Sequence, residues 1–139
     1  MIDILSGIKS TTAALDAERI RLDTISKNIA NARTTRSEGG KPYQRQLVVF
    51  ETALQQALDG QSTPLLRVAR IAKDPRPFQQ VYNPGHPDAN ADGMVQMPNI
   101  NIHEEMADLI AASRAFEANL AVARNARTLA MQTLAIGKR

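Results

Sequence analysis

Hydrophobic residues recur at intervals of seven over the first thirty positions of the chain. A period of seven is typical of the narrow apolar seam along which helices pack in a coiled coil. The pattern predicts a helix over 4–34, although Thr11 and Glu18 interrupt the seam and make it an imperfect one. We expect this seam to be an assembly surface, formed by Ile8, Leu15, Leu22, Ile25 and Ile29.

A second helical pattern follows Asn101, whose side chain is a good N-cap. Glu104 lies three residues further on, as in a capping box, and Gly137 is the expected C-cap. Large side chains along one face predict a second assembly seam, formed by Met106, Leu109, Phe116, Leu120 and Leu134. A stripe of small residues on another side fits either simple helix propensity or packing on more than one face; it comprises Ala111, Ala115, Ala118 and Ala126.

The segment between the two helical patterns differs from both, because it holds all seven prolines and the adjacent pair Gly39 and Gly40. Short apolar or alternating stretches predict strands over Gln44–Glu51, Leu66–Lys73, Phe78–Tyr82 and Gly93–Met97. Residues 51–59 suit a short helix, and 35–42 a Ser/Gly-rich turn. The chain is therefore predicted to be mainly α, with a helical domain over 1–34 and 99–139 and a small β-containing insert over 35–98.

Composition narrows the possible functions. The chain has 139 residues and a net charge of +3, from 17 basic and 14 acidic residues that are mixed along its length. The absence of cysteine excludes disulfides, thiolate metal sites and a cysteine nucleophile. No apolar run approaches the roughly 18 residues of a membrane-spanning helix. The first residues lack the features of a Sec-type signal peptide, so we expect any export to use another route.

Two short motifs suggest chemistry, and both are incomplete. Residues 88–93 (DANADG) match the first half of a calcium-binding loop, but Asn99 stands where a bidentate glutamate is required. His103 and Glu104 begin a zinc-protease motif, but Ala107 replaces the second histidine. No glycine-rich phosphate loop and no placed acid–base pair is present in the sequence. We therefore expect no enzyme activity, no catalytic residue, no metal and no cofactor.

The residues alone leave three classes of protein open. One is a structural subunit whose helices are covered only by neighbouring subunits. Another is a basic helical nucleic-acid-binding protein, which would gather arginine and lysine on one face. The third is a helical adaptor or chaperone of a secretion system, which would fold as a discrete dimer. The mixing of basic with acidic residues and the 4% aromatic content disfavour nucleic-acid binding.

Three stretches resemble the bacterial flagellar rod–hook family: SKNIANARTT at 26–35, VYNPGHPDANADGMVQMPNINIHEEM at 81–106 and ASRAFEANLAVARNA at 112–126. The first and third resemble patterns shared across the family. The second is more specific and resembles a stretch of a proximal-rod subunit. The family positions matched here are Asn28, Asn31, Pro84, Gly85, His86, Pro87, Asp88, Asn90, Gly93, Pro98, Asn99, Glu117 and Asn119.

There are departures from the family pattern. The tyrosine that follows the first motif in many relatives is expected at Tyr43, after a longer loop. Phe116 stands where tyrosine is common, and Asn83 stands where aspartate is usual.

The resemblance implies that the terminal helices pair into a coiled-coil-like tube domain and that the insert forms a small outer part. It implies a structural subunit of the proximal rod, the drive shaft of the bacterial flagellum basal body. The implied partners are other rod subunits and the rod-base adaptor, in a helical assembly, and the flagellar type III export apparatus. The implied location is the periplasm, reached without a cleaved signal peptide or a membrane span. Neither nucleic acid nor a small-molecule substrate is expected as a partner.

Overall fold

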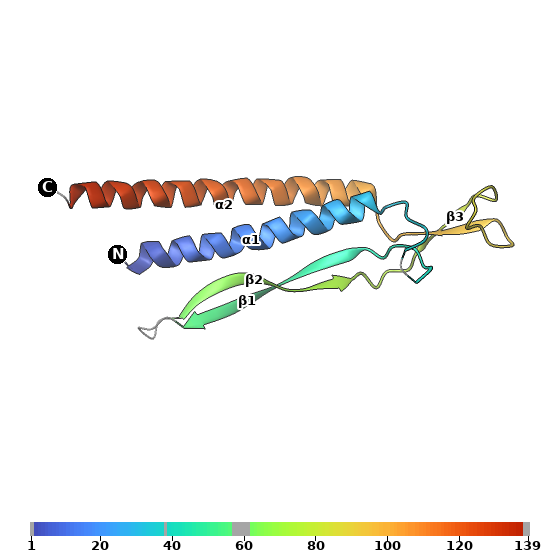
Figure 1. Ribbon diagram of the computed structural model, residues 1–139, viewed down its shortest axis with the longest axis horizontal. Helices are drawn as coiled ribbons and strands as arrows, with labels where there is room; N and C mark the ends of the chain where they lie inside the picture. Colours follow the sequence, from blue (N-terminus) through green and yellow to red (C-terminus); the bar gives the residue numbers. More distant parts are fainter. Residues whose placement is uncertain (1, 38, 57–61, 138–139) are drawn as a thin grey trace.

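The computed structural model describes residues 2–37, 39–56 and 62–137 (Figure 1). Two long helices lie at the two ends of the chain, and two β-hairpins lie between them in sequence. The prediction of a mainly helical fold with a β-containing middle is therefore confirmed in outline. The elements in chain order are α1 (Ile2–Ala30), β1 (Gln46–Gln56), β2 (Ser62–Lys73), β3 (Gln79–Tyr82), β4 (Met94–Met97) and α2 (Ile102–Ile136).

The two helices lie side by side and run in opposite directions, so that α1 begins near the end of α2 (Figure 1). The β1–β2 hairpin lies along the other side of α1 and contacts it through both strands. α1 is therefore flanked on two sides, whereas α2 packs on α1 alone among these elements. Within the described ranges, neither helix has a stretch that is both long and apolar enough to cross a membrane.

α1 ends at Ala30, four residues earlier than the sequence pattern predicts. The reason is local, because Asn31 caps the helix. Its side-chain amide donates a hydrogen bond to the Lys27 carbonyl at 2.9 Å, and its own carbonyl accepts from the Thr34 amide at 3.0 Å. The residues after Ala30 therefore form a turn that directs the chain toward β1.

The ends of α2 differ in part from the predicted caps. The Asn101 side chain accepts a hydrogen bond from the His103 amide at 3.0 Å, which confirms it as the N-cap. Glu104 does not complete the expected capping box; its carboxylate lies 3.5 Å from Arg76 instead. The Gly137 amide donates to the Thr133 carbonyl at 3.1 Å with φ −72°, so this C-cap forms without the left-handed backbone that favours glycine.

The β1–β2 hairpin is longer than predicted. Its antiparallel register runs from Gln46 opposite Lys73 to Gln56 opposite Ser62, with one irregularity beside Val49. The predicted short helix over 51–59 is wrong over 51–56, which belong to β1, while the rest of that range lies outside the described residues. Cross-strand pairing with β2 outweighs the local helix propensity of these residues, as tertiary context often does.

β3 and β4 form a second two-stranded antiparallel sheet, which projects beyond the helix pair (Figure 1). Gly93 closes the connection between these strands with a φ of 73°, a conformation that side chains disfavour. A Cβ at this position would lie 2.9 Å from Tyr82 Cε2 and 3.1 Å from Pro84 Cβ. The bend therefore requires glycine for two reasons, backbone conformation and space.

The interior is small, and many of the buried side chains in the described ranges are polar. The buried apolar residues there are Ala17, Ile25, Pro42, Val95, Pro98, Ile100 and Ala112. The buried polar residues are Thr24, Asn28, Asp74, Asn99 and Glu105. Because so little apolar surface is buried inside the subunit, directional polar contacts must fix much of its architecture.

Candidate assembly site

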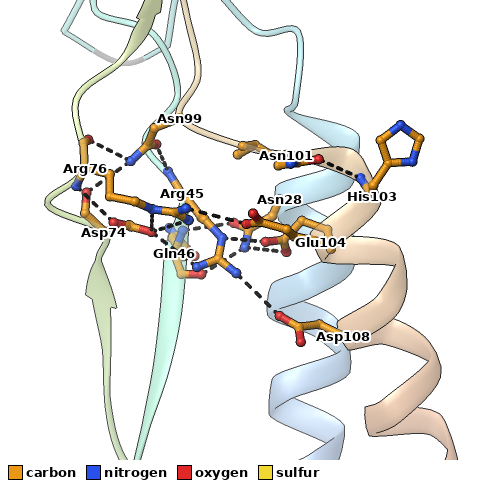
Figure 2. Close-up of polar contacts among 12 residues, drawn as sticks. Asn28, Arg45, Gln46, Asp74, Arg76, Asn99, Asn101, His103, Glu104 and Asp108 are labelled. Carbon is orange, nitrogen blue, oxygen red and sulfur yellow. Dashed lines mark hydrogen bonds and ion pairs between the residues drawn. The ribbon is translucent and has the colours of Figure 1, made fainter.

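Polar side chains from segments far apart in the sequence meet where α1 ends and α2 begins (Figure 2). They come from α1, from the approach to β1, from the end of β2 and from the start of α2. We call this cluster the polar junction; its members are Asn28, Tyr43, Arg45, Gln46, Asp74, Arg76, Asn99, Glu104, Glu105 and Asp108.

The centre of the polar junction is an ion pair between Arg45 and Glu105. Arg45 donates from Nε to the Glu105 carboxylate, whose side chain is fully buried. The same guanidinium group reaches Asp74 at 3.2 Å and Asp108 at 3.5 Å. One arginine therefore connects the end of β2 to the first turns of α2, in the fork geometry that suits several carboxylates.

Asn28 attaches α1 to the same cluster. Its side-chain carbonyl accepts from the Gln46 amide at 2.9 Å, and its side-chain amide donates to the Gln46 carbonyl at 2.9 Å. The amide also donates to Glu105 at 3.0 Å. Asn28 thus pairs with the first residue of β1 as a neighbouring strand would, while it holds the carboxylate of α2. Tyr43 donates its hydroxyl to the Asn28 carbonyl at 3.2 Å, and burial raises the pKa of this hydroxyl.

Asp74 and Asn99 fix the segments on either side of the second hairpin. Arg76 donates two hydrogen bonds to the Asp74 carboxylate, from its backbone amide and from Nε, each at 2.9 Å. The bond from the Arg76 side chain is the main reason that the pKa of Asp74 lies below its ordinary value of 3.8. The Asn99 side chain accepts from the Arg45 amide at 2.8 Å and donates to the Arg76 carbonyl at 2.9 Å.

The polar junction can hold geometry but offers no catalytic arrangement. Its buried carboxylates face guanidinium and amide groups that already occupy them. Breaking such a buried pair leaves an uncompensated charge, which is strongly destabilising, whereas the intact pair contributes modestly to net stability. The polar junction therefore contributes more to the specific arrangement of the segments than to the free energy of folding. Such a role is typical of a structural protein.

The structure places the predicted seam of α1 partly inside the subunit. Ile25 is buried, and the other predicted seam residues are half-buried: Ile8, Leu15, Leu22 and Ile29. In α2, Leu109, Phe116 and Leu120 are half-buried, whereas Met106 and Leu134 are exposed to 52% and 63%. That these residues form an assembly surface stays a prediction.

α2 exposes large apolar side chains on more than one side. Leu129 and Met131 lie two residues apart, so they point in different directions from the helix axis. We call the large apolar side chains that α2 leaves in solvent the exposed α2 residues: Ile102, Met106, Ile110, Val122, Leu129, Met131, Leu134 and Ile136. Most of them are absent from the predicted seam, because a seam prediction follows a single face.

The calcium-like loop between β3 and β4 uses its polar groups within the chain. Asp88 accepts a hydrogen bond from the Thr35 hydroxyl at 2.8 Å and pairs with Arg36 at 2.6 Å. The Asn90 side chain accepts from the amides of Asp92 and Met94. In the part of the chain that the structure describes, no group of three His, Asp or Glu side chains is placed to hold a metal ion.

The remaining family positions fall into three settings. Pro98 and Asn99 are buried beside the polar junction. Asn31, just after α1, and Asn119, in α2, are half-buried. His86 in the β3–β4 connection is also half-buried, and its Nδ1 accepts a hydrogen bond from the Asp88 amide at 3.1 Å. Exposed positions are Pro84, Gly85 and Pro87 in the loop and Glu117 on α2.

Sequence reasoning missed Arg45, Asp74 and Glu105 as members of one site. Their partners are distant in sequence, so no local spacing joins them. One pattern in the sequence could have identified Glu105. It lies four residues before Leu109 and seven before Ala112, on the apolar face of α2. A charged residue on that face requires a buried partner.

Known proteins resemble this chain along nearly its whole length. Residues 8–36 match the family described as flagella basal body rod protein, and residues 91–136 match the C-terminal family of flagellar basal body rod FlgEFG proteins. The flagellar basal-body rod protein FlgC of Borreliella burgdorferi is 38% identical, over 96% of this chain and 97% of its own length. FlgC of Yersinia enterocolitica is 40% identical over 91% of this chain and 92% of its own, and FlgC of Bacillus subtilis is 36% identical over 95% and 97%. The chain therefore belongs to the FlgC family of flagellar basal-body rod proteins and is a structural subunit, not an enzyme.

Proposed function

We propose that the chain forms part of the proximal rod, with the helical segments 1–34 and 99–139 as a coiled-coil-like tube domain and 35–98 as the smaller outer part. In this proposal the subunits stack helically with other rod subunits and with the rod-base adaptor. They reach the periplasm through the flagellar type III export apparatus and keep their N-terminal residues.

The observation that carries the proposal is the apolar surface of α2. Leu129, Leu134 and Ile136 are exposed to 59%, 63% and 76% in the isolated subunit. Burying one such side chain fully is worth about 1.5–3 kcal/mol. Apolar surface gathered along one helix marks a place where another protein packs. Because the exposed α2 residues lie on more than one side, a single partner helix would not cover them all, whereas several neighbours in a tube would.

A helical stack requires contacts that join different surfaces of successive subunits. Such heterologous contacts do not close into a dimer when their rotation leaves an open screw. The two helices suit this requirement because their exposed surfaces differ: α1 presents a charged stripe, whereas α2 exposes apolar side chains on more than one side. Lys9, Asp16, Arg19 and Asp23 are exposed on α1, while the exposed α2 residues lie on its antiparallel partner.

Leu129→Asp tests the proposal without disturbing the interior, because Leu129 is exposed in the subunit. Thr12→Asp is the matched control, since it adds the same charge to the exposed stripe of α1. We expect Leu129→Asp to be made normally but to be largely absent from isolated basal bodies, because a carboxylate in an apolar contact costs several kcal/mol. Thr12→Asp should be incorporated at a level close to that of the parent chain.

The readout is the amount of the chain in basal bodies beside its total amount in the cell, with the circular dichroism of each purified variant as a check of folding. Equal incorporation of Leu129→Asp and the parent chain would contradict the proposal that α2 is an assembly surface. Mass spectrometry of the incorporated chain tests the export route, since an intact N-terminus is expected and a processed one would contradict it.

A further inference from the structure

The β3–β4 hairpin has an unpaired strand edge. It consists of two short strands, and in the described ranges no third strand joins them. A two-stranded hairpin alone is marginally stable in water. All four residues of β3 are exposed, including Val81 at 46% and Tyr82 at 69%.

The backbone of β3 offers hydrogen bonds outward. The Asn83 amide donates to the Gly93 carbonyl at 2.9 Å, which fixes the alternation of the ladder. By that alternation Val81 bonds inward to β4, and the amide and carbonyl groups of Gln80 and Tyr82 point away from it. The corresponding edge of β4 is partly used, because the Met94 amide and carbonyl both bond to Asn90.

A polar cleft of about 350 Å³ lies on one face of this sheet, mainly beside β4. Gln80 and Gln96, which are directly opposite across the two strands, both line it. Asp88 and Asn90 line it from the β3–β4 connection, and the loop around Thr35 lines its other side. Glutamine amides both donate and accept, so they can hydrogen bond the polar side chains or the backbone of an extended chain.

We propose that the open edge of β3 receives an extended segment of a neighbouring axial subunit, which adds a third strand to this sheet. The inference rests on the proposed function, because it requires neighbouring subunits in the rod. Strand addition to an exposed edge is a general mode of recognition in which backbone hydrogen bonds supply affinity and side-chain pockets supply specificity. β3 also lacks the charged residues that usually protect an exposed edge from pairing.

The edge defines the chemistry of its occupant. Pro77 and Pro84 flank β3, so the added strand pairs over about four residues before the ladder must stop. Its side chains alternate, with polar ones toward Gln80 and the cleft and apolar ones beside Val81. The occupant is not β3 of a second copy, because two identical edges would pair around a two-fold axis, which closes and does not continue a rod.

A proline on this edge tests pairing with the added strand without breaking the hydrogen bonds of the hairpin itself. Gln80→Pro removes an outward amide and leaves the inward bonds of Val81, and proline is tolerated on strand edges. Gln80→Ala is the matched control, which keeps the backbone donor and removes only the side chain. With each variant as the only copy in the cell, we expect about tenfold less Gln80→Pro than parent chain in isolated basal bodies, while Gln80→Ala stays within about twofold.

A photo-crosslinking residue at position 80 makes the test independent of folding. Gln80→p-benzoylphenylalanine should form an adduct with another axial subunit in intact basal bodies, and the same residue at Ala91, exposed at the tip of the connection, should form far less. Parent-level incorporation of Gln80→Pro, or no axial adduct at position 80, would overturn the inference. If Gln80→Pro is degraded, the adduct alone decides. Absence of the parent chain from basal bodies would instead contradict the proposed function.

Discussion

The two ends of the helix pair are built in opposite ways. Where α1 ends and α2 begins, Glu105 and Asn28 are almost completely buried and hydrogen bonded to each other. Toward the end of α2, Leu129 and Ile136 are exposed to 59% and 76%. One end is fixed by polar contacts within the chain, and toward the other end the described part of the subunit leaves most of the exposed α2 residues uncovered.

This difference shows how a subunit can be specific in shape and still incomplete. Directional hydrogen bonds at the polar junction fix how the helices and the hairpins meet, and they need no neighbour. Apolar packing is not directional, so it can be supplied later by other subunits. The polar contacts that fix the subunit's architecture therefore lie at one end of the helix pair, and much of its exposed apolar surface lies toward the other.

The largest effect is expected from Glu105→Ala. This change leaves Arg45 partly buried beside a vacated carboxylate site, and breaking a buried ion pair costs about 3–5 kcal/mol. The neighbouring Glu104→Ala is the control, because Glu104 is 53% exposed and its pair with Arg76 should contribute less than about 1 kcal/mol. Urea denaturation of both purified variants gives the free energies of unfolding. Equal losses would mean that the buried pair does not hold the junction.

A smaller effect is expected within α2 of the unaltered chain. Amides of 122–136 should exchange with solvent at least about tenfold faster than those of 105–116 in the isolated subunit, because that end has fewer buried contacts. The difference should narrow in assembled rods. Hydrogen exchange measured by mass spectrometry resolves both segments, and uniform protection in the isolated subunit would remove the contrast between the two ends.

The smallest effect concerns pH. The pKa of Asp74 is lower in the folded chain than its ordinary 3.8, chiefly because Arg76 donates to it. The interaction therefore stabilises the fold above about pH 4, and this contribution is lost as the pH falls through the folded-state pKa. The urea midpoint should fall between about pH 5 and about pH 3, and it should fall less steeply in Asp74→Asn. Equal slopes in both proteins would exclude Asp74 as a source of the pH dependence.

The helices could be predicted from the sequence because their signals are local. Residues 8–38 contain neither proline nor glycine. Asn101 and Gly137 cap α2, as expected. The short helix predicted over 51–59 failed for the opposite reason. Its residues favour a helix locally, but each described one up to Gln56 has a partner in β2, from Arg67 to Ser62.

The polar junction could not be assembled from the sequence, since its contacts depend on the tertiary fold. Arg45 meets Asp74 only when the β1–β2 hairpin is in register, and it meets Glu105 only when α2 has folded back along α1. In the sequence alone, the adjacent Glu104 and Glu105 indicate only that acidic residues suit the N-terminus of a helix. The family resemblance marked Asn28 and Asn99 as motif positions, and the structure shows which backbone groups they bind.

The hydrogen bond between Asn28 and Glu105 has a kinetic consequence, since it joins residues 77 positions apart. Closing so long a loop carries an entropic cost that must be met before the contact stabilises anything, which slows folding relative to chains with local contacts. During synthesis, α1 is complete long before its partner emerges from the ribosome. The junction therefore cannot form until α2 has been synthesised.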